Sequence, residues 1–201
     1  MSEVIPEKLA AAKEFWQART RAGDAYVGRV GEDHRRQQQR MEQLLTQHFT
    51  PFDFYLDALD FGCGWGRMVP YFAQYCGHIW AVDIVPEMAQ RAAQKATTVT
   101  PLALGPNGQI NSPQVDLLWA GLVLQHIVNP DVLQATLHEL RRVLKRGARV
   151  LILDNAVDHA PHVQSRNPDE LASALLLQSW KVERVTINQR EQDHWLLDGI
   201  A

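Results

Sequence analysis

The chain has 201 residues, enough for one sizeable domain with its own core, and its 46% hydrophobic and 21% charged residues are typical of a soluble globular protein. A formal net charge of -3 gives no overall attraction for DNA or RNA, which disfavours a nucleic-acid partner. Two cysteines are too few for a disulfide framework, no apolar run reaches the roughly 18 residues of a membrane span, and the first 15 residues lack a signal-peptide core. We therefore expect a cytoplasmic protein that does not associate with membranes.

Residues 1–50 and 51–201 differ in composition, which predicts two parts. From about residue 6 to residue 48 the chain is polar, rich in Gln and Arg and helix-forming, with a break at 22–33. We expect residues 1–50 to form a helical cap or lid on a core of residues 51–201. The arginines between Arg19 and Arg40 either bind an anionic group of a substrate or form a solvated helix face, and the solvated face is the commoner use of such a run.

Strand-like and helix-like segments alternate in the second part. Strands are predicted at residues 54–61, 78–84, 97–104, 114–121 and 148–155. Helices are predicted at residues 65–76, 86–96, 130–147 and 167–178, with Gly147 as the stop of the third. Strands separated by helix-length segments indicate a mostly parallel sheet with helices on both faces.

The C-terminal segment breaks this alternation. Residues 181–188 and 193–200 both read as strands, and the gap between them is too short for a crossover helix. They should therefore pair antiparallel through a tight hairpin. The predicted fold is α/β: a doubly wound, mostly parallel seven-stranded sheet with an antiparallel last strand, helices on both faces and an N-terminal helical cap.

Three glycines directly follow the first predicted strand, in the stretch "LDFGCGWGRM" of residues 59–68. The dinucleotide fingerprint needs a glycine five residues after Gly62, where this chain has Arg67, and no Gly-Lys-Ser/Thr follows as in a phosphate loop. What remains is Asp60 at the strand end, a G-x-G-x-G turn, and Asp83 at the tip of the second strand. A carboxylate at that tip binds both hydroxyls of a ribose. The plainer alternative is that Asp83 caps the next helix and the glycines only form a turn.

These segments resemble the class I S-adenosylmethionine-dependent methyltransferases. "LDFGCGWGRM" is similar to the first motif of that family, and "AVDI" is similar to its acidic second-strand end. "VDLLWAGLVLQHI" resembles its fourth strand and following loop, and "LHELRRVLKRGARVLILDN" resembles its fifth-strand unit. The resemblance covers residues 54–201 and implies S-adenosylmethionine as cofactor and S-adenosylhomocysteine as product.

The resemblance also implies a set of cofactor-binding residues. These are Asp60, Gly62, Cys63, Gly64, Asp83, Ile84, Leu104 and Ala120, to which Tyr26 is added as part of a lid with Trp16 and Arg19. Asp83 would hold the ribose, Ile84 would pack on the adenine, and Ala120 would lie near the transferred methyl. The chain lacks the acidic or amide side chain that the family commonly has after the third strand, so Leu104 would read the adenine through backbone groups.

The acceptor is expected to be a small molecule. "WAGL" stands where nucleobase amino-methyltransferases carry Asp/Asn-Pro-Pro-aromatic, and neither cysteine follows a proline as in cytosine C5 methylation. "LVLQHI" instead resembles the loop of enzymes that act on small molecules. The expected reaction is methyl transfer by in-line displacement to an oxygen or nitrogen of a small acceptor, including phosphorylated, sugar and natural-product acceptors. The alternatives are a methyltransferase acting on protein or RNA and a non-catalytic sensor or scaffold that binds the cofactor.

His126 is the candidate general base, because it follows the tip of the fourth strand. Its alternative role is that of a packed turn residue. His159 and His162 fall where a substrate loop is expected, and loop histidines are more often solvated than metal-bound. Asp154 and Asn155 match part of the magnesium site of catechol-type O-methyltransferases, but the acidic residue after the fourth strand is missing. No metal site is expected.

Overall fold

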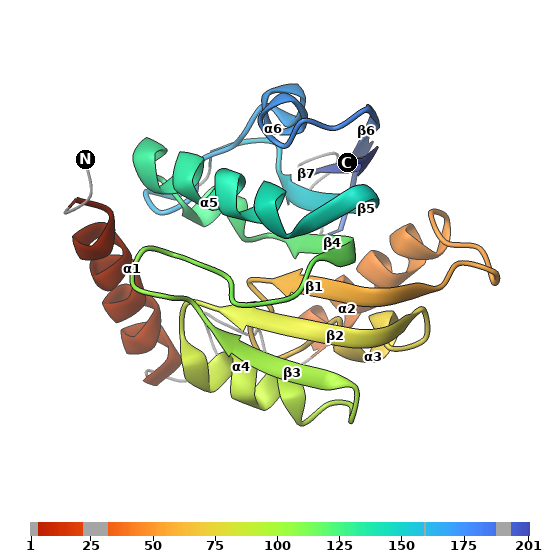
Figure 1. Ribbon diagram of the computed structural model, residues 1–201, viewed down its shortest axis with the longest axis horizontal. Helices are drawn as coiled ribbons and strands as arrows, with labels where there is room; N and C mark the ends of the chain where they lie inside the picture. The colour runs from red at the N-terminus through yellow and green to blue at the C-terminus, as the bar shows by residue number, and fades with distance from the viewer. Residues whose placement is uncertain (1–3, 22–31, 159, 188–193) are drawn as a thin grey trace.

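The computed structural model describes residues 4–21, 32–158, 160–187 and 194–201 (Figure 1). Seven strands in these ranges form one sheet in the order β3-β2-β1-β4-β5-β7-β6. The strands are β1 Tyr55–Phe61, β2 Cys76–Asp83, β3 Val99–Ala103, β4 Val115–Gly121, β5 Leu144–Asn155, β6 Ser179–Val185 and β7 His194–Ile200. Strands β1 to β5 run parallel, whereas β7 lies between β5 and β6 and is antiparallel to both. The predicted sheet is confirmed, including its reversed last strand.

Helices cover both faces of this sheet, as predicted. They are α1 Val4–Arg21, α2 Glu32–Thr46, α3 Val69–Phe72, α4 Pro86–Ala93, the 3-10 turn η1 Leu124–His126, α5 Pro130–Val143 and α6 Pro168–Ala174. One core cluster joins residues of α2, α3 and α4 to one face, and a second joins α5 and α6 to the other. Because both faces are covered, the central strands are near-continuous apolar runs such as Val150–Leu153, in which each residue is fully buried.

Several predicted helix bounds are wrong, and the two largest differences have a physical reason. The helix expected to stop at Gly147 ends at Val143, because Leu144 is buried and pairs with Val115 at the start of β5. Gly147 instead lies inside β5, with φ +81° and its N–H donating to the carbonyl of Ala201 at 2.6 Å. The helix expected over residues 65–76 is reduced to α3, because the glycine turn extends through Gly66, whose φ is +73°.

The N-terminal helices occupy different places. Met41 and Leu45 of α2 are buried in the core cluster beside α3, so α2 covers a sheet face. In contrast, α1 stands across the end of the sheet to which the parallel strands point (Figure 1). Lys8 of α1 forms an ion pair with Asp131 of α5 at 3.0 Å. The division at residue 50 and the role of residues 1–50 as a cap or lid stay predictions. Within the described ranges, no helix has the length and apolar character needed to cross a membrane.

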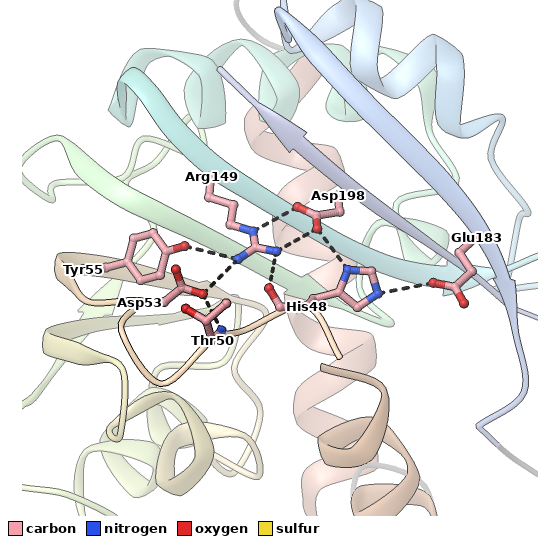
Figure 2. A network of polar contacts seen from close by, with 7 residues as sticks. All are labelled: His48, Thr50, Asp53, Tyr55, Arg149, Glu183 and Asp198. Atoms are coloured by element: carbon pink, nitrogen blue, oxygen red, sulfur yellow. Dashed lines mark hydrogen bonds and ion pairs between the residues drawn. The ribbon is translucent and has the colours of Figure 1, made fainter. Parts of the chain in front are cut away.

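A polar network ties the α2–β1 connection to β5 and β7 near the amino end of β1 (Figure 2). The half-buried guanidinium of Arg149 donates to both oxygens of Asp198, at 3.0 and 2.7 Å, and to the carbonyl of His48 at 2.6 Å. It also donates to the hydroxyl of Tyr55 at 3.3 Å. The His48 ring lies between Asp198, at 3.0 Å, and Glu183, at 3.2 Å. Burial alone would raise the pKa of Asp198, but the bonds from Arg149 and His48 outweigh it and hold that pKa below its usual value.

We expect Asp198→Asn to lower the free energy of unfolding by about 2–3 kcal/mol at pH 7, because it leaves Arg149 with only the more distant carboxylate of Asp53, at 3.8 Å. The folded-state pKa of Asp198 lies below its unfolded value, so its contribution is present above pH about 4 and is lost as the pH falls below that. Urea denaturation at several pH values measures the difference from wild type, which should shrink in acid. Asp131→Asn, at an exposed ion pair, should cost less than about 1 kcal/mol.

Candidate functional site

The glycine turn is fastened to β2 through its backbone. Gly62, Gly64 and Gly66 all have positive φ, at +72°, +51° and +73°, a region that residues with a side chain rarely adopt. The N–H groups of Gly62 and Cys63 both donate to the carbonyl of Val82, at 2.8 and 2.9 Å. The turn therefore has a fixed position at the carboxyl ends of β1 and β2.

The three glycines have different steric surroundings. A Cβ on Gly62 would lie 2.3 Å from a methyl of Val123, and one on Gly66 would lie 2.6 Å from the Cα of Ala92. A Cβ on Gly64 would meet no described atom within 4 Å. Gly62 and Gly66 are thus required by packing, whereas Gly64 is the position at which a ligand can approach the backbone.

Asp83 connects this turn to the next helix. One carboxylate oxygen accepts the N–H of Gly64 at 2.9 Å, and the other accepts the N–H of Val85, the N-cap of α4, at 2.9 Å. Burial raises the pKa of Asp83 above its usual value, against these hydrogen bonds. The capping alternative is thus present in the structure, and each oxygen still has acceptor capacity beyond its backbone bond. Ile84 follows and is half-buried.

Asp60 and Cys63 lie beside the turn but differ in chemistry. Asp60 is 4% exposed, and burial together with the negative charge of Asp83 raises its pKa to about 7, against the opposing charge of Arg67. Burial also raises the pKa of the Cys63 thiol, so Cys63 is no thiolate nucleophile at neutral pH. The side chain of Arg67 donates to Gln37 of α2 at 3.1 Å.

Ala120 and Leu104 offer less to a ligand than their positions in the sequence indicate. Ala120 is fully buried in the apolar core, so neither its side chain nor its backbone is exposed to a ligand in this structure. Leu104 pairs with Ile110 in an isolated bridge, and Gly105 donates to the carbonyl of Gln109 at 2.8 Å. Recognition of adenine by the backbone at Leu104 stays a prediction. Part of the backbone there already forms hydrogen bonds within its own turn.

A small apolar hollow lies beside Leu104 between α1 and α5. It is lined by Ile5, Leu9, Phe61, Leu104, Asn107, Gly108, Ile110, Val132, Ala135, Thr136 and Glu139. The N-terminal half of α1 thus forms a wall over the ends of β1 and β3.

The C-terminal half of α1 meets His126 and His162 in a cluster of rings. The two imidazoles stack with centroids 5.5 Å apart and planes 10° from parallel, and Trp16 packs edge-on against His126 at 4.8 Å. Arg19 lies 3.1 Å from Nε2 of His162 and 4.3 Å from the centre of the Phe15 ring. We call Phe15, Trp16, Arg19, His126 and His162 the α1 clamp. Tyr26, the remaining lid residue expected from the sequence, lies outside the described residues.

Hydrogen bonds fix the protonation of His126. Its Nδ1 is 3.0 Å from the carbonyl oxygen of His162, so Nδ1 carries a hydrogen. Its Nε2 is 3.2 Å from Nε2 of Gln125, whose amide oxygen accepts the N–H of Asn155 at 3.0 Å. Because that bond orients the amide, its NH2 donates to His126. His126 is therefore neutral here, with its basic lone pair engaged by Gln125, a residue that sequence reasoning missed and whose only signal was its place beside His126.

Asp154 and Asn155, the carboxylate and amide after the fifth strand, lie at the end of β5. Asp154 is fully buried, and burial raises its pKa well above the usual value, against the opposing charge of Arg166. The described residues contain no group of three His, Cys, Asp or Glu side chains that could hold a metal ion. His159 lies outside the described residues.

The steric difference among the glycines gives a stability prediction. Gly64→Ala should cost only the strain of a left-handed alanine, about 1–2 kcal/mol, because its side-chain direction is open. Gly66→Ala adds a backbone clash with Ala92 and should cost about 3 kcal/mol or more. Urea denaturation of the two variants compares these costs, and equal losses would contradict the steric distinction.

Comparisons with known proteins agree with this geometry. A family profile described as "Methyltransferase domain" matches residues 59–152. The malonyl-[acyl-carrier protein] O-methyltransferase of Salmonella typhimurium is 28% identical over 215 residues, which span 100% of this chain and 78% of that protein.

Solved methyltransferase structures share the fold. The N-methyltransferase NodS from Bradyrhizobium japonicum WM9, in complex with S-adenosyl-L-homocysteine, matches with a TM-score of 0.65 and 16% identity, over 83% of this chain and 85% of that one. Magnesium protoporphyrin IX methyltransferase from Synechocystis PCC 6803, with bound S-adenosylmethionine, matches with a TM-score of 0.67 and 15% identity, over 96% of both chains. The profile match across the glycine turn shows a methyltransferase domain at residues 59–152, and the strand order and the solved structures show that the chain has the fold of S-adenosylmethionine-dependent methyltransferases.

Proposed function

We propose that the protein binds S-adenosylmethionine between the Gly64 turn and Asp83 and transfers its methyl group to an oxygen or nitrogen of a small-molecule acceptor. The observation that carries the proposal is the pairing of an open backbone at Gly64 with a carboxylate bonded to that same backbone at 2.9 Å. A nucleoside can approach the turn closely there while its ribose hydroxyls donate to the carboxylate.

The residues around the turn fit the cofactor's chemistry. When bound, the cofactor supplies a methyl group on a positively charged sulfonium. Asp60 and Asp83 place two carboxyl groups beside the turn, and a cationic ligand favours their ionised forms. Ile84, which is half-buried, and Leu104, which lines the apolar hollow, supply apolar surface for a purine.

The acceptor would bind between the turn and the α1 clamp. Trp16 and His126 lie 4.8 Å apart there and join α1 to the loop after β4, so they can exclude water from the reacting atoms. An acceptor that must lose a proton needs a base, and His126 is neutral as a base requires. Its lone pair becomes available when the acceptor displaces the amide of Gln125.

The full-length match to a malonyl-[acyl-carrier protein] O-methyltransferase supports an oxygen acceptor and adds a second candidate, an acyl group presented on a carrier protein. A cofactor-binding sensor would share the site without turnover. Measurement of S-adenosylhomocysteine formation with free acids, with amines and with acyl-carrier thioesters distinguishes these three functions.

Asp83→Ala should weaken S-adenosylmethionine binding by about 2–4 kcal/mol, since each hydrogen bond to a charged group is worth about 1.5–3 kcal/mol. Calorimetry measures the affinity, circular dichroism verifies folding, and Asp83→Asn serves as a milder second variant. Glu87→Ala, which removes an exposed carboxylate from the first turn of α4, should bind as wild type does. If a folded Asp83→Ala protein binds S-adenosylmethionine with wild-type affinity, the only role left for Asp83 is to cap α4.

Substitutions of His126 distinguish a role as general base from a role in packing. His126→Phe keeps a ring between Trp16 and His162 but has no lone pair. If His126 is the base, His126→Phe and His126→Ala should both lower turnover by roughly 100-fold at unchanged cofactor affinity, and the wild-type rate should fall in acid as imidazole protonates. Turnover at saturating cofactor and melting temperature are measured together. An active Phe variant beside an unstable Ala variant would assign His126 to packing.

A further inference from the structure

Strand β6 leaves one edge of the sheet unpaired within the described part of the chain. It is the outermost strand, paired only with β7. Six of its seven residues, Ser179 to Arg184, are exposed. An exposed edge of this length is a template for pairing with another chain, and proteins commonly block such edges with charge. The charged side chains of β6 therefore influence which strand can pair with this edge.

The two faces of β6 differ in chemistry. Lys181 and Glu183 share the face on which α2 packs, since Glu183 contacts His48, which follows α2. Trp180, Val182 and Arg184 share the opposite face, since the indole N–H of Trp180 donates to Asp169 of α6 at 2.8 Å. Trp180 and Val182 are each 39% exposed, which is a large exposure for apolar side chains in a strand.

This sequence is complementary to itself when reversed. In an antiparallel pair of two β6 strands centred on Val182, residue 181 stands opposite residue 183, and residue 180 stands opposite residue 184. Each Lys181 then faces Glu183 of the second copy, so two opposite-charge pairs form on the α2 face. On the other face the two Val182 side chains meet, and each Trp180 lies beside Arg184 of the second copy, as in a cation–π pair.

Neighbouring registers that keep each sheet face continuous are less favourable. Centring the pair on residue 181 places Lys181 directly opposite itself, and centring it on residue 183 places Glu183 opposite itself. Like charges directly opposite one another destabilise a strand pair. The charges that would block other partners or registers therefore favour this one arrangement.

We propose that the partner of the β6 edge is a second copy of this chain, joined by antiparallel β6–β6 pairing centred on Val182 into a two-fold symmetric dimer with one continuous sheet. The proposal is independent of the proposed function. Three strands, β4, β5 and β7, separate β6 from β1, whose end carries the glycine turn, so dimer formation leaves the turn accessible.

A charge exchange tests the proposal in the full chain. In the dimer, Lys181→Glu places a glutamate opposite Glu183 of the second copy at two positions. The repulsion should raise the dissociation constant of the dimer roughly tenfold or more. The double variant Lys181→Glu with Glu183→Lys restores both pairs in reversed order and should restore the dimer. Sedimentation over a range of concentrations measures the association, and thermal melting verifies that loss of the Glu183–His48 contact has not unfolded the double variant. Wild type that stays monomeric at all concentrations, or a dimer indifferent to Lys181→Glu, would overturn the proposal.

A cysteine on the two-fold axis tests the register. In Val182→Cys, the two new thiols would stand directly opposite one another, within the Cα separation of about 4.4–6.8 Å that a disulfide needs. Mild oxidation should give a cross-linked dimer. The matched control Arg184→Cys has its two copies four residues apart along the strand direction, about 13 Å, and should not cross-link. The native Cys63 and Cys76 are buried and should not interfere. Cross-linking of both variants alike, or of neither, would contradict the register.

Discussion

The hydrogen bond from Gly64 to Asp83 is the contact on which the site depends. It joins the turn after β1 to the end of β2, and the second oxygen of the same carboxylate holds the entry to α4. The two flanking glycines have no room for a side chain, because Val123 and Ala92 fill that space. The turn is therefore held in place by packing on both sides of Gly64 and by a charged acceptor in front of it. A backbone held in this way is preorganised for a ligand, which reduces the entropy lost on binding.

The opposite end of the sheet has a stabilising role. There the guanidinium of Arg149 in β5 bonds to the start of β1 and to Asp198 of β7. His48 lies between Asp198 and β6 and continues the network to that strand (Figure 2). This network fixes the reversed strand β7 between β5 and β6, with no role in binding at the glycine turn. Separation of the two roles follows from the parallel sheet, which gathers its loops for ligand binding at the carboxyl ends of the strands.

The α1 clamp joins segments far apart in the chain. Trp16 and Arg19 come from the N-terminal helix, His126 from the turn after β4, and His162 from the loop after β5. The two imidazoles stack on one another, Nδ1 of His126 donates to the carbonyl of His162, and Nε2 of His162 faces the guanidinium of Arg19. The clamp thus combines aromatic rings with the positive charge of Arg19, whereas Asp60 and Asp83 lie beside the glycine turn.

The sequence by itself determined the sheet, and it predicts a site at the glycine turn. Apolar runs alternating with helix-length segments predict parallel strands, and a gap too short for a helix predicts the reversed β7, because these follow from local periodicity and chain length. The tertiary structure decided which glycine is open, since the clashes at Gly62 and Gly66 come from Val123 and Ala92, distant in sequence. It also decided that Gly147 lies inside β5, and that Gln125 engages the lone pair of His126. Such features depend on contacts between segments that only folding brings together, and no local pattern of residues encodes them.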